Sequence, residues 1–422
     1  MAGALLVVAA SLSGCSGNGA ASDGPVKNPA ALPAVVAKAK AENAAVNPAL
    51  VEADNTFGLR ALQALQSQHS SVNIAISPLS LSLALQILYN GAAGNTQQAI
   101  AQTLRLGTLT TQQLNDANAA LQATLSAADP QVELNIANSL WLHLNDVTVA
   151  PAFTTMDQNY YGATIGDLAA APDNVNTWVA DATHGLIPAI LPADDYSRVT
   201  AVIANAVYFK GQWTTPFDTN STQPALFTLS DGRSTSAHMM HQTGTFAYFH
   251  GAGFQMVSLP YGQGRVSMLV MLPDPGISPG TLLANMSAAA LDTVVGQMQD
   301  SYGSVALPKF TAQSNSDMGQ VLKALGMGVA FNCPGLLGAG PLADFSALTS
   351  ARVCVTSVAH NAWVQVDELG TVAAAATSIT VGTTAARQVQ FTMNMDHPFL
   401  YAIRDDDTGV LLFVGTLLDP SQ

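Results

Sequence analysis

The sequence predicts an α+β protein, and the periodicity of three stretches carries that prediction. Residues 55–69, with Asn55 as the expected cap, have the pattern of a helix whose apolar face is formed by Phe57, Ala61, Leu62 and Leu65. Residues 134–141 alternate between polar and apolar as a half-buried strand does. Residues 202–208 are apolar on both faces apart from Asn205, which is typical of a strand inside a sheet.

Composition limits the class of protein. Hydrophobic residues make up 49% of the 422, enough for a sizeable core. The formal net charge of −14 argues against nucleic acid, which requires a basic surface. No HExxH or phosphate-loop motif occurs, and we expect neither an enzyme active site nor a cofactor. His238 and His241 are spaced as metal ligands are, but no third ligand is near, and we expect two strand or surface histidines and no metal.

Residues 1–15 are expected to be a lipoprotein-type signal peptide. The apolar run 4–10 is too short to span a bilayer, and residues 12–15, LSGC, resemble a bacterial lipobox that would be lipidated at Cys15. No Lys or Arg precedes the run, so the true start can lie upstream, and a plain secretory signal is the alternative. Either way we expect export, as a cell-surface or outer-membrane lipoprotein or to the periplasm or the extracellular space.

Two further expectations concern the chain that follows. Residues 16–48, rich in Ala, Asn, Gly and Pro, are expected to be a flexible tether to a single domain over residues 49–422. Cys333 and Cys354 are the cysteines outside the signal, and in an oxidising compartment they would either pair or stay free, since spacing alone does not give their distance.

The most informative stretch runs from Val366 to Arg387. It begins as a strand, and Gly370 then supplies a flexible joint. Residues 371–384 contain no charge and no proline, and both faces are small or apolar, so they can form a central strand. A helix over 372–376 and a flexible linker are alternatives, but the β-branched residues that follow favour a strand.

Several blocks of this chain resemble the serpin family. Residues 368–377, ELGTVAAAAT, resemble the hinge of inhibitory serpins, and residues 396–420 resemble the serpin C-terminal signature. Further matching blocks lie at residues 73–104, 176–191 and 202–218. Over roughly residues 50–420 the chain is identified as a member of the serpin family, of the bacterial, inhibitory type. It departs from the family pattern at Leu186, Leu369 and Val372, where charged residues are common; the two in the hinge are uncharged and do not block insertion.

The resemblance implies a fold and a function. The implied fold is one α+β domain with a large central, mostly antiparallel sheet, further sheets, about eight or nine helices and an exposed reactive loop near the C-terminus. The implied function is suicide-substrate inhibition of serine proteases, in which the cleaved loop 370–384 inserts into the central sheet while the protease is held as an acyl-enzyme. A non-inhibitory serpin that binds or carries a ligand is the alternative. A monomer is expected.

The resemblance also implies site residues. Insertion is expected to begin beside Trp213. Family spacing places the cleaved bond at Thr384–Ala385, which suits an elastase-like or subtilisin-like protease, with cleavage at Arg387 by a trypsin-like enzyme as the alternative. A polar shutter cluster beneath the sheet would consist of Ser77, Ser80, Asn205 and His360. The hinge residues would be Glu368, Gly370, Thr371, Ala373, Ala374, Ala375, Ala376 and Thr377.

Overall fold

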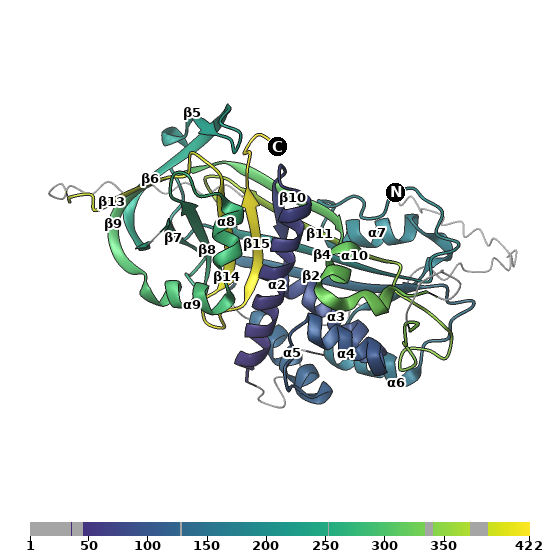
Figure 1. Ribbon diagram of the computed structural model, residues 1–422. Coiled ribbons are helices and arrows are strands. Elements are labelled where there is room, and N and C mark those ends of the chain that lie inside the picture. Colours follow the sequence, from purple (N-terminus) through teal and green to yellow (C-terminus); the bar gives the residue numbers. More distant parts are fainter. Residues whose placement is uncertain (1–34, 36–44, 127–128, 252, 334–340, 372–386) are drawn as a thin grey trace, which may run out of the picture.

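The computed structural model describes residues 45–126, 129–251, 253–333, 341–371 and 387–422, together with Val35. Helices and two large sheets share one hydrophobic core, which confirms the predicted α+β fold (Figure 1). The predicted signal peptide with Cys15, most of the tether and loop residues 372–386 lie outside the described residues.

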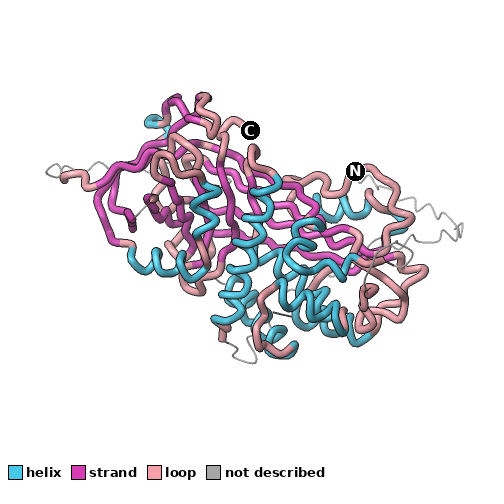
Figure 2. The backbone as a smooth tube through the Cα atoms, in the orientation of Figure 1, coloured by secondary structure: helices cyan, strands magenta, loops and turns pink. Residues whose placement is uncertain are grey.

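Most of the helices lie on one side of the smaller sheet. Figure 2 shows α3 to α6 gathered beneath it, and Figure 1 places α7 on the opposite side. Short 3-10 or π turns occur at Leu168–Ala170, Thr219–Ser221, Lys323–Met327 and Gly328–Phe331. The nine α-helices of the described residues are α2 Pro48–Gln68, α3 Pro78–Gly91, α4 Gly94–Thr103, α5 Thr111–Leu125, α6 Pro151–Tyr160, α7 Asp173–Ala182, α8 Pro279–Asn285, α9 Ala288–Gln297 and α10 Gly319–Leu322.

Helix α2 begins earlier than the sequence predicts, and the expected cap at Asn55 is wrong. The N-cap is Asn47, whose side chain accepts a hydrogen bond from the backbone N–H of Ala49, and Pro48 occupies the first turn, where its missing N–H costs nothing. Asn55 is instead buried inside the helix, where its amide bonds Gly409 and Leu411 of a distant hairpin. The four predicted apolar positions of this helix are all buried.

The smaller sheet has six strands and contains the segments predicted as strands. Its order is β10-β11-β4-β2-β3, and β12 pairs with β4 beside this path. Strands β11 and β4 are parallel, as are β2 and β3, whereas the other pairs are antiparallel. The bounds are β10 Phe310–Asp317, β11 Ser357–Val366, β4 Ala201–Gln212, β2 Val132–Leu142, β3 Thr164–Asp167 and β12 Gly370–Thr371.

The larger sheet has nine strands and forms the other half of the molecule (Figure 1). Its order is β1-β15-β14-β8-β7-β6-β9-β13, with β5 paired to β6. Helix α2 packs on β15, and α8 packs on β8 and β14. The bounds are β1 Ile74–Ile76, β5 Gln223–Thr228, β6 Ser234–Gly251, β7 Phe254–Tyr261, β8 Val266–Pro273, β9 Gln299–Pro308, β13 Phe391–Asn394, β14 Phe399–Asp405 and β15 Leu411–Leu417.

Both faces of the six-stranded sheet are covered in its middle. Ala204 and Ala206 of β4 and Ala359 of β11 pack with Trp178 and Val179 of α7. The residues between them along the strands point the other way, toward α3, which packs on β2 and β4. The sheet centre therefore lies between α7 and α3, and a strand entering there would be covered on both sides.

One residue of the N-terminal segment that was predicted to be a tether packs on the domain. Val35 is fully buried beside Ala119 and Ala123 of α5, so at this residue the predicted tether contacts the domain. Among the described residues, no helix combines the length and the apolar character needed to cross a membrane.

Candidate functional site: the seam between strands β4 and β11

The central feature of the six-stranded sheet is the boundary between β4 and β11, which we call the seam. Here two parallel strands meet, with His360 opposite Asn205 and Trp363 opposite Tyr208. At one end of the seam β12 pairs antiparallel with β4, with Gly370 opposite Gln212 and Thr371 opposite Gly211. The first two residues after the turn that ends β11 therefore already occupy the sheet beside β4.

The entry to the seam is held by two hydrogen bonds that Trp213, the residue after β4, donates to backbone carbonyls. The backbone N–H of Trp213 donates to the carbonyl of Leu369 at 2.9 Å, and its indole N–H donates to the carbonyl of Asp367 at 2.9 Å. Gly370 has a φ of 145°, and an added Cβ would collide with the carbonyl oxygen of Gly211. Only glycine fits at this joint.

Glu368 anchors the base of the hinge through its carboxylate. It accepts hydrogen bonds from Lys309 Nζ at 2.7 Å and from the Thr222 hydroxyl at 2.8 Å, and its side chain is about nine-tenths buried. Burial opposes ionisation, but these bonds outweigh it, so the pKa of Glu368 lies below its ordinary value. The carboxylate is therefore charged at neutral pH and fixes the strand that precedes Gly370.

Thr371 is the last described residue of the hinge, and its side chain is fully buried. Its hydroxyl lies 2.9 Å from the hydroxyl of Tyr261, whose ring stacks on Trp213 with centroids 4.3 Å apart. Burial raises the pKa of Tyr261 well above its usual range, so the phenol stays protonated and can serve as the donor. The pocket at this position fits a small side chain with a hydroxyl.

The four residues of the predicted shutter cluster come together beneath the seam. His360 Nδ1 lies 2.5 Å from Asn205 Oδ1, across the seam. The Asn205 amide donates to the carbonyl and the hydroxyl of Ser80, and the Ser77 hydroxyl accepts the N–H of Ser80. The backbone N–H of Ser77 donates to His360 Nε2 at 3.1 Å. The network thus ties β11 to β4 and ties both strands to the start of α3.

His360 is neutral in this network. Its Nε2 accepts a backbone N–H, so Nδ1 carries the proton and donates to Asn205. Complete burial lowers the pKa of His360 to about 3, because a charged imidazolium would be desolvated. The hydrogen bond across the seam therefore persists throughout the physiological pH range.

Asn138 of β2 belongs to the cluster and was not predicted. It lies opposite Asn205 in the antiparallel β2–β4 pair, and its Oδ1 accepts a hydrogen bond from the Asn205 amide at 2.6 Å. A single polar residue such as Asn138 in an alternating strand does not by itself indicate a functional site. Pairing residues 134–141 with 202–208 would have placed Asn138 beside Asn205. Asn205 thus bridges three strands of the sheet.

The other predicted site residues fall into three groups. The structure joins Cys333 to Cys354 in a disulfide with Cα atoms 5.1 Å apart. His238 and His241 are exposed on β6, and the described residues contain no group of three or more metal-ligating side chains. The predicted cleaved bond Thr384–Ala385 and hinge residues Ala373 to Thr377 lie outside the described residues.

Comparisons with known proteins agree with this geometry. A family model described as "Serpin (serine protease inhibitor)" matches residues 52–420. Human Serpin B9 is 33% identical over 383 residues, covering 88% of this chain and 99% of the relative. An uncharacterized serpin-like protein from Thermococcus kodakarensis is 30% identical, covering 88% and 86% of the two chains.

Solved structures show the same fold. The thermophilic serpin tengpin in its native state has a TM-score of 0.79 at 26% identity, covering 89% of this chain and 95% of its own. Human thyroxine-binding globulin complexed with thyroxine has a TM-score of 0.78 at 23% identity, covering 88% and 99%.

Proposed function

Because the chain belongs to the serpin family, whose model is described as serine protease inhibitor, we propose that it is a suicide-substrate inhibitor of serine proteases. The protease cleaves the loop after Thr384 and forms an acyl-enzyme. The segment from Gly370 to Thr384 then enters the seam as a new strand, and the protease is displaced and distorted before it can deacylate.

The observation that carries this proposal is the position of β12 at the mouth of a parallel seam. A strand that continues β12 runs antiparallel to both β4 and β11 and can bond both of them. The roughly 15 residues of the loop would extend about 50 Å. At a net 0.5–1.5 kcal/mol per hydrogen bond, the new strand would gain on the order of 10–20 kcal/mol.

The register of β12 predicts where each loop residue arrives. Gly370 lies opposite Gln212 and Thr371 opposite Gly211, so each step forward in the loop is one step back in β4. Thr377 then reaches Asn205, where its hydroxyl can take over the partners that Asn205 and His360 lose when the seam parts. Val381 reaches Ala201, the first residue of the 12-residue strand β4. Cleavage after Thr384 therefore supplies an arm that spans the whole strand.

Family spacing supports Thr384–Ala385 as the cleaved bond, and the residues on either side of it support a class of target protease. Thr384 before Ala385 suits a protease with a small apolar pocket, such as an elastase-like or subtilisin-like enzyme. Arg387, the alternative, donates to the Thr245 hydroxyl at 3.2 Å and lies 4.9 Å from the ring centroid of Tyr302. These contacts hold its guanidinium against β6 and β9 rather than presenting it to a trypsin-like enzyme.

The test uses the buried hydroxyl at the start of the hinge. Thr371→Arg places a charge in the closed pocket beside Tyr261, so the hinge cannot enter the sheet quickly. With elastase or subtilisin, we expect wild type to form a covalent adduct on a denaturing gel and Thr371→Arg to give cleaved protein instead. The conservative variant Thr371→Ser should still form the adduct. Undiminished trapping by Thr371→Arg would refute insertion, and cleavage of wild type without an adduct would indicate the alternative of a binding or carrier protein.

We also propose that this is a bacterial protein exported as a monomeric, lipidated serpin. The lipobox-like residues ending at Cys15 support a bacterial source and membrane attachment, and the Cys333–Cys354 disulfide supports an oxidising compartment. A Cys15→Ala variant expressed in a bacterium should move from the membrane fraction to the soluble exported fraction, and an unchanged distribution would contradict lipidation.

A further inference from the structure

Asn361 is a buried polar residue in the middle of β11, on the face of the sheet opposite His360. It is fully buried. Its neighbours on that face are Ala359 and Trp363 along the strand and Ala206 across the seam, all members of the apolar cluster beneath α7. An amide side chain is therefore enclosed in an apolar layer directly beside the seam.

Neither polar atom of this amide is satisfied. Among the described residues, no group lies within hydrogen-bonding distance of Asn361 Nδ2 or Oδ1. A buried amide without partners loses its hydrogen bonds to water and regains none, so it raises the energy of the state that buries it. The asparagine opposite it on β10, Asn315, is exposed and avoids this penalty.

The two faces of β11 thus act in opposite directions. His360 is bonded at both ring nitrogens and holds β11 to β4. One residue later, Asn361 opposes the closed arrangement. Parting of β4 and β11 removes Ala206 from beside the amide and opens it to water or to the polar groups of an incoming strand.

We propose that Asn361 is a positioning residue for loop insertion: its unpaired amide destabilises the closed seam and lowers the barrier to opening. The proposal rests on the inhibitory function proposed above. It predicts that an apolar side chain of similar size will stabilise the uncleaved protein and slow insertion.

The test compares Asn361→Leu with Asn315→Leu, a matched change on the neighbouring strand, same face, at an exposed site. For Asn361→Leu we expect the thermal midpoint of the uncleaved protein to rise by about 2–4 °C. Conversion to the inserted, uncleaved form on mild heating should slow at least about fivefold. In reactions with elastase, slower insertion should increase cleaved protein relative to covalent adduct. Asn315→Leu should change the midpoint by no more than about 1 °C.

The outcomes separate the two proposals. If Asn361→Leu leaves the midpoint unchanged or lowers it, and Asn361→Ala does the same, the amide is not a source of strain. If the midpoint rises while conversion and adduct yield stay unchanged, the residue does not control opening. If wild type itself forms no adduct with any serine protease, the inhibitory function fails, yet the midpoints still decide whether the amide is strained.

Discussion

Asp54 of α2 is a buried carboxyl group that faces two side chains of α3. It is fully buried, accepts a hydrogen bond from Gln86 at 3.1 Å, faces Ser82, and has no ion pair with any described residue. Burial raises the pKa of Asp54 to about 8, and burial raises that of Asp157, near the end of α6, to about 7. Both carboxyls lie close enough to Tyr161 to act on its titration. The folded protein therefore holds protons there that the unfolded chain releases above about pH 4.

This buried acid predicts how stability depends on pH. Because the pKa of Asp54 is higher in the folded protein than in the unfolded chain, its contribution to the free energy of unfolding is fully present below about pH 4. That contribution is lost as pH rises toward 8. Asp54→Asn should make the slope of unfolding free energy between pH 5 and 8 shallower by about 1.4 kcal/mol per pH unit, measured by urea unfolding. The exposed Asp231→Asn change should leave that slope as in wild type, and equal slopes for all three proteins would contradict the assignment.

Asn205 gives a second prediction at the scale of one residue. Its side chain bonds Ser80, Asn138 and His360, so Asn205→Ala leaves several buried partners unsatisfied. We expect a loss of about 2–4 kcal/mol in stability, together with faster amide hydrogen exchange in β4 and β11 and a tendency to polymerise. Gln313→Ala, at an exposed site on β10, serves as the control. If amide hydrogen exchange in β4 and β11 is unchanged in Asn205→Ala, the shutter cluster does not hold the two strands together.

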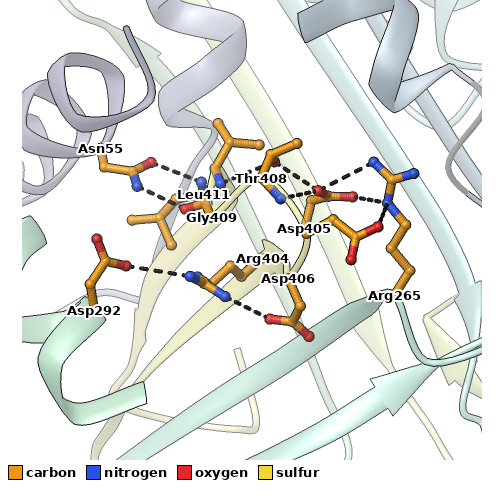
Figure 3. Close-up of polar contacts among 11 residues, drawn as sticks. Asn55, Arg265, Asp292, Arg404, Asp405, Asp406, Thr408, Gly409 and Leu411 are labelled. Carbon is orange, nitrogen blue, oxygen red and sulfur yellow. Dashed lines mark hydrogen bonds and ion pairs between the residues drawn. The ribbon is translucent and has the colours of Figure 1, made fainter. Parts of the chain in front are cut away.

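At the scale of elements, one charged hairpin ties three parts of the chain together. Strand β14 ends at Asp405, which is fully buried and accepts a hydrogen bond at 2.7 Å from Nε of Arg265, the residue just before β8 (Figure 3). Asn55 of α2 bonds the turn that follows at Gly409, and Arg404 reaches Asp292 of α9. The acidic run that begins at Asp405 is thus a structural joint between α2, α9 and β8.

The hairpin predicts a contrast between buried and exposed ion pairs. Asp405→Asn removes the buried carboxylate beside the mostly buried Arg265 and leaves only the exposed Asp407 as its counter-charge, and we expect a loss of about 2–4 kcal/mol in urea unfolding. Asp231→Asn breaks the exposed pair with Arg233 and should leave the urea unfolding curve close to that of wild type. If the two variants lose comparable amounts of unfolding free energy, burial does not determine how much these ion pairs contribute to stability.

The elements show what the sequence could and could not predict. Alternation and apolar content identified β2, β4 and the end of β11, because strands buried between helices carry that pattern over many residues. The start of α2 was missed, because Asn55 has the chemistry of a cap but uses its amide for a tertiary contact that no local pattern contains. The shutter residues came from the family resemblance, whereas Asn138 and the unpaired Asn361 depend on strand register, which only the folded sheet provides.

At the scale of the whole molecule, the proposed function requires that the six-stranded sheet accept one more strand of the same chain. The parallel β4–β11 pair is the point at which one antiparallel strand would bond on both edges, and β12 already marks its register. Two sets of interactions oppose entry of the loop: the hydrogen bond between Asn205 and His360 across the seam, and the bonds of the Glu368 carboxylate. The unpaired buried amide of Asn361 favours entry. Under the proposed function, the uncleaved form persists for kinetic reasons, because the inserted state is lower in free energy and is reached slowly unless the loop is cut.

Cutting the loop should therefore stabilise the protein, which is the reverse of what proteolysis does to most folds. An insertion gain on the order of 10–20 kcal/mol, set against an unfolding entropy near 2.1 cal/mol/K per residue, predicts that the thermal midpoint rises by about 10–25 °C after cleavage near Thr384. Calorimetry of nicked and intact protein at one scan rate measures this. Thr371→Arg, cut at the same bond, is the control, because its hinge cannot enter beside Tyr261 and its midpoint should stay close to that of the uncut form. If the nicked wild type melts no higher than the intact protein, the seam does not accept the loop, and the position of β12 has no bearing on inhibition.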